Sequence, residues 1–156
     1  GNWDGPRLSG WWGHDKQTRF QMGPDFVPIK GAEGWQISNA PILAMACLRA
    51  SMAIFDKVGM SLIRSKSEKL TGYMEFLMNT ISNKVEIVTP ADATQRGSQL
   101  SLVMNKNGKD VFNQLGLQGV ICDWREPDVI RVAPAPLYNS FIEVYRFYEI
   151  LKSLAV

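Results

Sequence analysis

The chain lacks most of the groups from which reactive or metal-binding centres are built. Its 156 residues contain two cysteines and one histidine, and the absence of a CxxC pair excludes the common zinc-ligand spacings. Cys47 lies in an apolar helical pattern, and Cys122 ends an apolar strand pattern. These positions predict buried, reduced thiols, with no disulfide framework and no metal site.

The chain also lacks a large excess of charge of one sign and a long hydrophobic run. Its 17 Lys and Arg residues against 15 Asp and Glu give a net charge of +2. Because the basic residues form no stripe, a nucleic-acid partner is not expected. The longest apolar stretch, from Ala40 to Leu48, is far shorter than the ~20 residues that cross a bilayer. With no signal-like start either, we expect a cytoplasmic protein with no membrane partner.

The residues that are present are typical of a globular protein. Apolar residues make up 46% and charged residues 21% of the chain, and a chain of this length buries roughly 70% of its unfolded surface. The first residue is Gly1 rather than methionine, which suggests a chain that has been processed, tagged or excised.

The first 39 residues are rich in glycine and tryptophan and contain Pro6, Pro24 and Pro28. They show no sustained helical or strand period, which predicts loops and short extended pieces. Irregular segments longer than ~15 residues are usually functional loops or disordered. The predicted organisation is a loop-rich segment at 1–39, a helical connector at 40–82 and a small α+β domain at 83–156.

Two helices are predicted in the connector, separated at Gly59. Pro41 suits the first turn of the first helix, and Ser38 or Asn39 can cap its free amides. The second helix is about twenty residues long. The apolar stripes are Met45, Leu48, Met52 and Phe55 in the first helix, and Leu62, Lys66, Leu70, Tyr73, Leu77 and Ile81 in the second.

The remaining segment predicts the element order β-β-α-β-β-α. This order is typical of an α+β fold with two helices against one face of a mainly antiparallel sheet. Ser140 and Glu143 form a capping box before a final helix with Val144, Phe147, Tyr148 and Leu151 on one face. The predicted strands are Val85–Thr89, Leu100–Met104, Val120–Cys122 and Val129–Val132, with a turn at Glu126–Asp128 and a short helix (Val111, Phe112, Leu115) before Gly119.

Asn39 stands at the start of a predicted helix, where unpaired amides and the helix dipole attract an anion. A bound phosphate is chemically reasonable here. A nearby tryptophan supplies an indole N–H donor and excludes water. The alternative is that Asn39 is a plain N-cap.

Trp11 and Trp12 lie between Gly10 and Gly13 and are followed by the only histidine, His14. This pattern favours either an aromatic-lined ligand pocket or a core aromatic cluster. A lone histidine is either a catalyst or a residue whose hydrogen bonds are satisfied structurally.

Arg131 is the charged residue of an apolar strand, between Ile130 and Val132. A charge in that position must be paired or reach the surface. Its guanidinium matches a carboxylate bidentately. The alternative is a solvent-facing arginine on an alternating strand whose neighbours point inward.

Five segments together resemble the C-terminal part of kynureninase, from about Arg7 to the end of the chain. They are GWWGHDKQTRF (10–20), GAEGWQISN (31–39) leading into APIL, KSEKLTGYMEFL (66–77), RGSQLSL (96–102) and IRVAPAPLYNS (130–140). Kynureninases are pyridoxal phosphate enzymes of the aspartate aminotransferase superfamily, fold type I. They are homodimers that hydrolyse kynurenine or 3-hydroxykynurenine to an anthranilate and alanine in tryptophan catabolism.

The resemblance implies that residues 83–156 are the small domain of such an enzyme and that residues 1–39 belong to its large domain. It also implies roles for individual side chains. Trp11 and Asn39 would contact the cofactor phosphate in the neighbouring subunit's site, Arg131 would hold the substrate α-carboxylate, and Trp12, His14 and Ser38 would lie near the substrate's aryl ring.

One departure from the family is an absence. The family's Schiff-base lysine follows a tyrosine, and neither Lys16 nor Lys30 has that context. The resemblance therefore implies a C-terminal fragment without its catalytic residue, inactive alone and without covalently bound pyridoxal phosphate. The alternatives are another fold type I enzyme, such as a cysteine desulfurase or an aminotransferase, and a non-enzymatic module for amino-acid binding or dimerisation.

Overall fold

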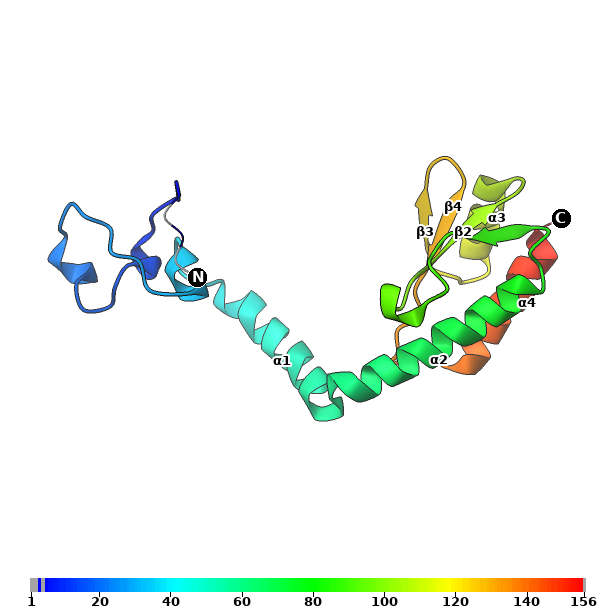
Figure 1. The fold of residues 1–156 in the computed structure, drawn as a ribbon, viewed down its shortest axis with the longest axis horizontal. Helices are drawn as coiled ribbons and strands as arrows, with labels where there is room; N and C mark the ends of the chain where they lie inside the picture. Colours follow the sequence, from blue (N-terminus) through cyan, green and yellow to red (C-terminus); the bar gives the residue numbers. More distant parts are fainter. Residues whose placement is uncertain (1–2, 4, 156) are drawn as a thin grey trace. The chain divides into compact units, whose positions relative to one another are not determined.

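A computed structural model describes residue 3 and residues 5–155. The chain divides into two compact units, with the boundary between Ile54 and Phe55. Each unit is described by itself (Figure 1). No helix of the described residues has the length and apolar character needed to cross a membrane.

The described residues of the first unit are irregular up to residue 41, and the sequence predicts irregular structure at 1–39. These residues contain three short 3₁₀ helices, Trp11–Gly13 (η1), Arg19–Gln21 (η2) and Ala32–Trp35 (η3), and one isolated β-bridge, between His14 and Pro28.

Glycines hold the two tryptophan-containing segments of this unit backbone to backbone. A Cβ atom on Gly13 would collide with the carbonyl of Gly34, and one on Gly10 would collide with the backbone of Ile37. Only residues without a side chain allow so close an approach. The glycines that flank the tryptophans in the sequence therefore bring the segments 10–14 and 31–37 together.

Helix α1, Ile42–Val58, confirms the first predicted helix, and the carbonyl of Pro41 accepts its first hydrogen bond, from the Met45 amide at 2.9 Å. Its predicted apolar stripe is not buried, since no residue of α1 is buried within the described chain. The prediction that Cys47 is buried is wrong for the same reason. Amphipathic spacing predicts that a helix face will be covered, but not which part of a protein covers it.

Helix α2, Met60–Asn79, confirms the second predicted helix and its length. The break lies at Gly59, whose φ of 82° is a backbone conformation that glycine adopts without strain. The buried face differs from the predicted stripe at its start, where Ile63 is buried and Leu62 is 67% exposed. Downstream, Leu70 and Leu77 are buried as predicted.

The second unit contains a four-stranded antiparallel sheet with strand order β1-β2-β4-β3. The strands are Val85–Ile87 (β1), Leu100–Met104 (β2), Asp123–Arg125 (β3) and Val129–Val132 (β4). A short 3₁₀ helix, Ala93–Gln95 (η4), precedes β2, and the helices α3 (Gly108–Leu117) and α4 (Phe141–Leu154) follow β2 and β4. The predicted α+β class and element order are confirmed.

The core of this unit lies on one face of the sheet. Alternating residues of β2 and β4 are buried there, as strand geometry requires. Three helices rather than the predicted two contribute to it, because α2 packs against α4 and β1 (Figure 1). The fully buried side chains include Leu70, Met74 and Met78 of α2, Leu100 and Leu102 of β2, Leu115 of α3, Ile130 of β4 and Leu151 of α4.

One predicted strand is wrong. Val120–Cys122 are not in a strand, and β3 begins one residue later, at Asp123. The hairpin register pairs Arg125 with Val129 and Asp123 with Arg131, so residues 120–122 would have to pair with residues 132–134. Pro134 has no N–H group to donate to a ladder, and β4 ends at Val132.

The capping box predicted for α4 is present. Ser140 Oγ accepts from the Glu143 amide at 3.4 Å, and the Ser140 amide donates to the Glu143 carboxylate at 2.7 Å. The hydrogen bond from the Ser140 backbone amide is the main cause that lowers the pKa of Glu143, and the bond from the Ser140 hydroxyl is the second. The face predicted for α4, Val144, Phe147, Tyr148 and Leu151, is buried.

Replacing Ser140 with alanine is expected to lower the free energy of unfolding by about 1 kcal/mol, because it removes the cap of α4. Since the pKa of Glu143 is lowered in the folded state, its contribution is present at neutral pH and disappears as the pH falls through that lowered pKa. Urea unfolding at neutral and acidic pH measures both effects. The control is Glu149→Gln on the same helix, and an equal loss in both variants would contradict the role of the cap.

Candidate functional site

Trp12 and Asn39, two of the predicted site residues of the first unit, are in contact. The indole Nε1 of Trp12 donates to Oδ1 of Asn39. The guanidinium of Arg19 lies over the Trp12 ring, 4.9 Å from its centroid, and donates to the carbonyls of Trp12 and His14 at 3.0 and 3.1 Å. These contacts fix the Trp12 ring and the Asn39 amide relative to each other.

The contact with Trp12 determines what Asn39 can still bind. Because its amide oxygen accepts from the indole, its amino group remains as the donor. Helix α1 begins at Ile42, and Pro41 accepts its first hydrogen bond, so Pro41 rather than Ser38 or Asn39 stands at the N-cap position. The free amides of the first turn of α1 and the Asn39 amino group together match the donor chemistry that a phosphate requires.

Trp11 and His14 line a shallow cavity of about 280 Å³. The Trp11 ring meets Phe20 edge to face, with centroids 5.2 Å apart, and the ring of His14 lies 5.6 Å from that of Phe26. Trp11 is 45% exposed. Ser38, also predicted in this region, is exposed beside Asn39.

Both ring nitrogens of His14 have hydrogen-bond partners. The Val27 amide donates to Nδ1 at 3.5 Å. Nε2 lies 3.0 Å from Thr18 Oγ1, whose hydroxyl in turn donates to Asp15 at 3.1 Å. His14 thus belongs to a hydrogen-bonded chain, which is the structural role given above as one alternative for a lone histidine.

The alternative of a core aromatic cluster is wrong for this chain. Trp11, Trp12 and Trp35 are 45%, 38% and 49% exposed. Their rings therefore form a surface rather than a core, and such exposed aromatic groups are typical of binding sites.

Arg131 lies in the second unit, on the sheet face opposite the core. Its neighbours Ile130 and Val132 point inward and are buried, as strand alternation predicts. Its Nε donates to Asp123 Oδ2 at 2.8 Å, and its NH2 contacts the same oxygen. Hydrogen bonding from Arg131 and the nearby charge of Arg125 lower the pKa of Asp123. Arg131 is therefore paired and also one-third exposed.

The segment after Arg131, which contains Pro134 and Pro136, forms a hydrogen-bonded turn. The Asn139 side-chain oxygen accepts from the Ala135 amide at 2.7 Å, and the Ala135 carbonyl accepts from the Asn139 amide at 2.8 Å. This turn connects the end of β4 to the capping box of α4.

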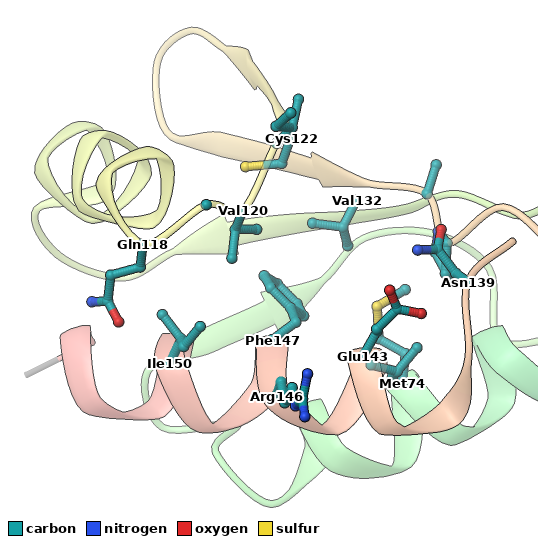
Figure 2. A pocket seen from close by; sticks show the side chains of 15 residues that line it. Met74, Gln118, Val120, Cys122, Val132, Asn139, Glu143, Arg146, Phe147 and Ile150 are labelled. Atoms are coloured by element: carbon teal, nitrogen blue, oxygen red, sulfur yellow. The ribbon is translucent and has the colours of Figure 1, made fainter.

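The second unit also has a groove of about 390 Å³, between α4 and the segment 118–122. Figure 2 shows Phe147 of α4 below Val120 and Val132, with Ile150 and Glu143 at opposite ends. Burial raises the pKa of Cys122 in its wall, which disfavours the reactive thiolate. The groove contains none of the predicted site residues.

Sequence reasoning missed two residues that position the candidate site residues. Arg19 supports Trp12, and Asp123 holds Arg131. Arg19 lies close after the tryptophans in the sequence, which is only a weak sign of a contact with them. Asp123 was not recognisable as the partner of Arg131, because the predicted third strand ended before it, at Cys122. Lys16 pairs with Glu33 at 2.6 Å, and within the described residues no acidic, histidine and cysteine side chains gather as a metal site.

The chain is similar to known proteins over most of its length. The family model for the kynureninase C-terminal domain matches residues 63–151. Kynureninase from Myxococcus xanthus is 57% identical over 153 residues, which are 97% of this chain and 36% of the relative. Kynureninase from Xanthomonas euvesicatoria is 52% identical over 99% of this chain and 37% of its own length. The chain therefore spans little more than a third of these relatives.

Solved structures show the fold independently. Two structures of the cystine C–S lyase C-DES, one with glycine covalently linked to its pyridoxal phosphate cofactor and one with cysteine persulfide, each give a TM-score of 0.68. The two alignments each cover 96% of this chain, and they cover 37% and 38% of the solved chains, at 16% identity. The likeness establishes the fold, and the family follows from the sequence comparisons.

Proposed function

The chain belongs to the kynureninase family, and from this we propose that it is part of a pyridoxal phosphate-dependent hydrolase. The proposed reaction converts L-kynurenine or 3-hydroxykynurenine to anthranilate or 3-hydroxyanthranilate and L-alanine. When bound, pyridoxal phosphate supplies the electron sink for bond cleavage. The residues of this chain bind and orient the substrate and the cofactor.

The observation that carries the proposal is the group of donors around Asn39. Its amide oxygen accepts from Trp12, so its amino group is free to donate to a phosphate oxygen near the first turn of α1. The exposed indole of Trp11 supplies a further donor. We propose that Trp11 and Asn39 bind the cofactor phosphate in the site of a second subunit of a homodimer.

The proposed substrate contacts follow from charge and shape. The guanidinium of Arg131 binds the α-carboxylate, because a planar fork of N–H donors matches a carboxylate bidentately. Trp12, His14 and Ser38 line the region of the aryl ring. The ring of His14 is held by its contacts with Thr18 and Val27 and would orient groups of the substrate.

We further propose that the 156-residue chain alone does not catalyse the reaction. None of its four tyrosines is followed by a lysine, which is the context of the family's Schiff-base lysine. Pyridoxal phosphate mixed with the isolated chain and then reduced with borohydride is expected to label no single lysine stoichiometrically. Mass spectrometry measures the labelling, and one fully labelled lysine would refute this part of the proposal.

The function is tested by assaying the full-length protein for anthranilate release from L-kynurenine. The GWWGH and GWQISN segments, with their indole and amide donors, favour a kynureninase over other enzymes of this fold. Sulfide release from cysteine or transamination of a keto acid, without anthranilate, would support a cysteine desulfurase or an aminotransferase instead. Saturable binding of kynurenine without turnover would support an amino-acid-binding module.

Replacing Asn39 with alanine in the full-length protein is expected to raise the Kd for pyridoxal phosphate about tenfold, the cost of one hydrogen bond to a charged group. The variant also removes the acceptor of the Trp12 indole. Absorbance titration of the cofactor measures the Kd. The control is Asn113→Ala, an exposed substitution on α3, and an unchanged Kd in Asn39→Ala would remove Asn39 from the phosphate site.

A further inference from the structure

Arg131 and Asp123 form a hydrogen-bonded ion pair across the β3–β4 hairpin. They are opposite each other in the antiparallel register, where facing side chains lie close enough to interact. Asp123 Oδ2 accepts from Arg131 Nε at 2.8 Å and is in contact with NH2. The carboxylate therefore occupies the side edge of the guanidinium, formed by Nε and NH2.

A guanidinium has a second edge that can receive a carboxylate. It has five N–H donors in a rigid plane, and the pair with Asp123 leaves the donors of NH1 and one of NH2 at the end of the side chain. A second carboxylate can bind that edge bidentately without displacing the first.

We propose that Asp123 is a positioning residue, which holds the side edge of Arg131 so that its end edge faces the α-carboxylate of the substrate. This inference rests on the proposed function, because it assigns a partner to the arginine that would bind the substrate. Asp123 itself does not touch the substrate.

The charges in contact with Asp123 fit this arrangement. Arg125 lies on the same carboxylate, with its NH2 3.1 Å from Asp123 Oδ2. This cluster of two guanidinium groups and one carboxylate carries a net charge of +1, which attracts an incoming carboxylate, although Glu126 and Asp128 of the turn bring the whole hairpin to −1. Ser101, opposite Arg131 on β2, is uncharged. Asp123 thus orients Arg131 without cancelling the positive charge of the site.

The opposite model makes Asp123 a competitor that occupies Arg131 until the substrate displaces it. The two models predict opposite effects of Asp123→Asn, which keeps the shape of the side chain and removes its charge. A positioning residue supports substrate binding, so its loss raises KM. A competitor opposes substrate binding, so its loss lowers KM.

The kinetic test uses the full-length protein. Asp123→Asn is expected to raise KM for L-kynurenine about tenfold, the scale of one lost charged hydrogen bond, with kcat nearly unchanged. An inhibitor with the structure of kynurenine but without the α-carboxylate serves as a comparison. Its Ki is expected to stay at the wild-type value. Glu126→Gln, which removes one negative charge from the same hairpin, is expected to leave KM unchanged. A KM that falls or stays constant in Asp123→Asn, or a parallel rise in the Ki of the inhibitor, would overturn the proposal.

A second measurement is independent of turnover. In the 156-residue chain labelled with ¹⁵N-arginine, the Arg131 Nε–H signal is expected to exchange with water more slowly than that of the exposed Arg146. Asp123→Asn is expected to abolish this protection. Equal exchange at Arg131 and Arg146 in the wild type would refute the orientation by Asp123. If the full-length protein releases no anthranilate while the protection is present, the proposed function fails and the orientation of Arg131 stands.

Discussion

Replacing Arg131 with alanine in the full-length protein is expected to lower kcat/KM for L-kynurenine about a thousandfold, equivalent to about 4 kcal/mol of transition-state binding. The variant removes the guanidinium proposed to hold the α-carboxylate, and with it the bidentate hydrogen bonds that orient the substrate. It also leaves Asp123 without its main partner, which adds a negative charge near the site. Initial rates of anthranilate release at varied kynurenine concentration measure the effect.

Two further variants separate the role of the guanidinium from that of charge alone. Arg131→Lys keeps the charge but loses the planar fork, and we expect it to recover only a small part of the lost kcat/KM. Arg125→Ala removes a neighbouring arginine that also contacts Asp123, and we expect a much smaller loss. Equal losses in Arg125→Ala and Arg131→Ala would mean that the hairpin supplies only a general positive charge.

Replacing Glu75 with glutamine is expected to destabilise the second unit by about 3 kcal/mol, because it leaves a buried cation without its counter-charge. The side chain of Arg96 is only 4% exposed, and its NH2 lies 2.6 Å from Glu75 Oε2. NH1 of Arg96 donates to the Pro90 carbonyl at 3.1 Å. The pair therefore anchors the segment between β1 and β2 to α2. Urea unfolding followed by circular dichroism measures the loss.

A matched control and a double variant test this cause. Glu68 pairs with Arg64 on the same helix, where the two side chains are 44% and 36% exposed, and Glu68→Gln is expected to change the free energy of unfolding by less than about 0.5 kcal/mol. Replacing both partners, Glu75→Leu with Arg96→Met, is expected to recover at least half of the lost stability, because the buried cation is then removed together with its counter-charge. A double variant as unstable as Glu75→Gln would mean that the pair contributes shape rather than charge balance.

The helices and most strands could be predicted because local patterns determine them. The break at Gly59, the alternation of β2 and the capping box of Ser140 and Glu143 each depend on residues close in sequence. Burial is not local in this sense. The stripe of α1 predicts an apolar face correctly, but only contacts with distant residues decide whether that face is covered, and in the described chain it is exposed.

The candidate site was predictable in residue type more than in geometry. The rare groups of tryptophan, asparagine and arginine identified the family, and the family comparison confirmed it. The contacts of Asn39 were not predictable, because its partner Trp12 is 27 residues away. The third strand was placed too early because the residues Val120–Cys122 are apolar, while the hairpin register is set by the turn and by Pro134. The proposed roles toward substrate and cofactor stay predictions for all six site residues: Trp11, Trp12, His14, Ser38, Asn39 and Arg131.

The sequence by itself determined that this chain is an α+β protein of the kynureninase family with an aromatic segment, a cappable final helix and one arginine in an apolar strand. Only the tertiary structure decided that Asn39 turns its oxygen to Trp12, and that Arg131 gives one edge to Asp123. The physical reason is that hydrogen-bond direction depends on the positions of both partners in space. The sequence shows which donor and acceptor groups are present, but the direction in which each group points is set only when the segments pack.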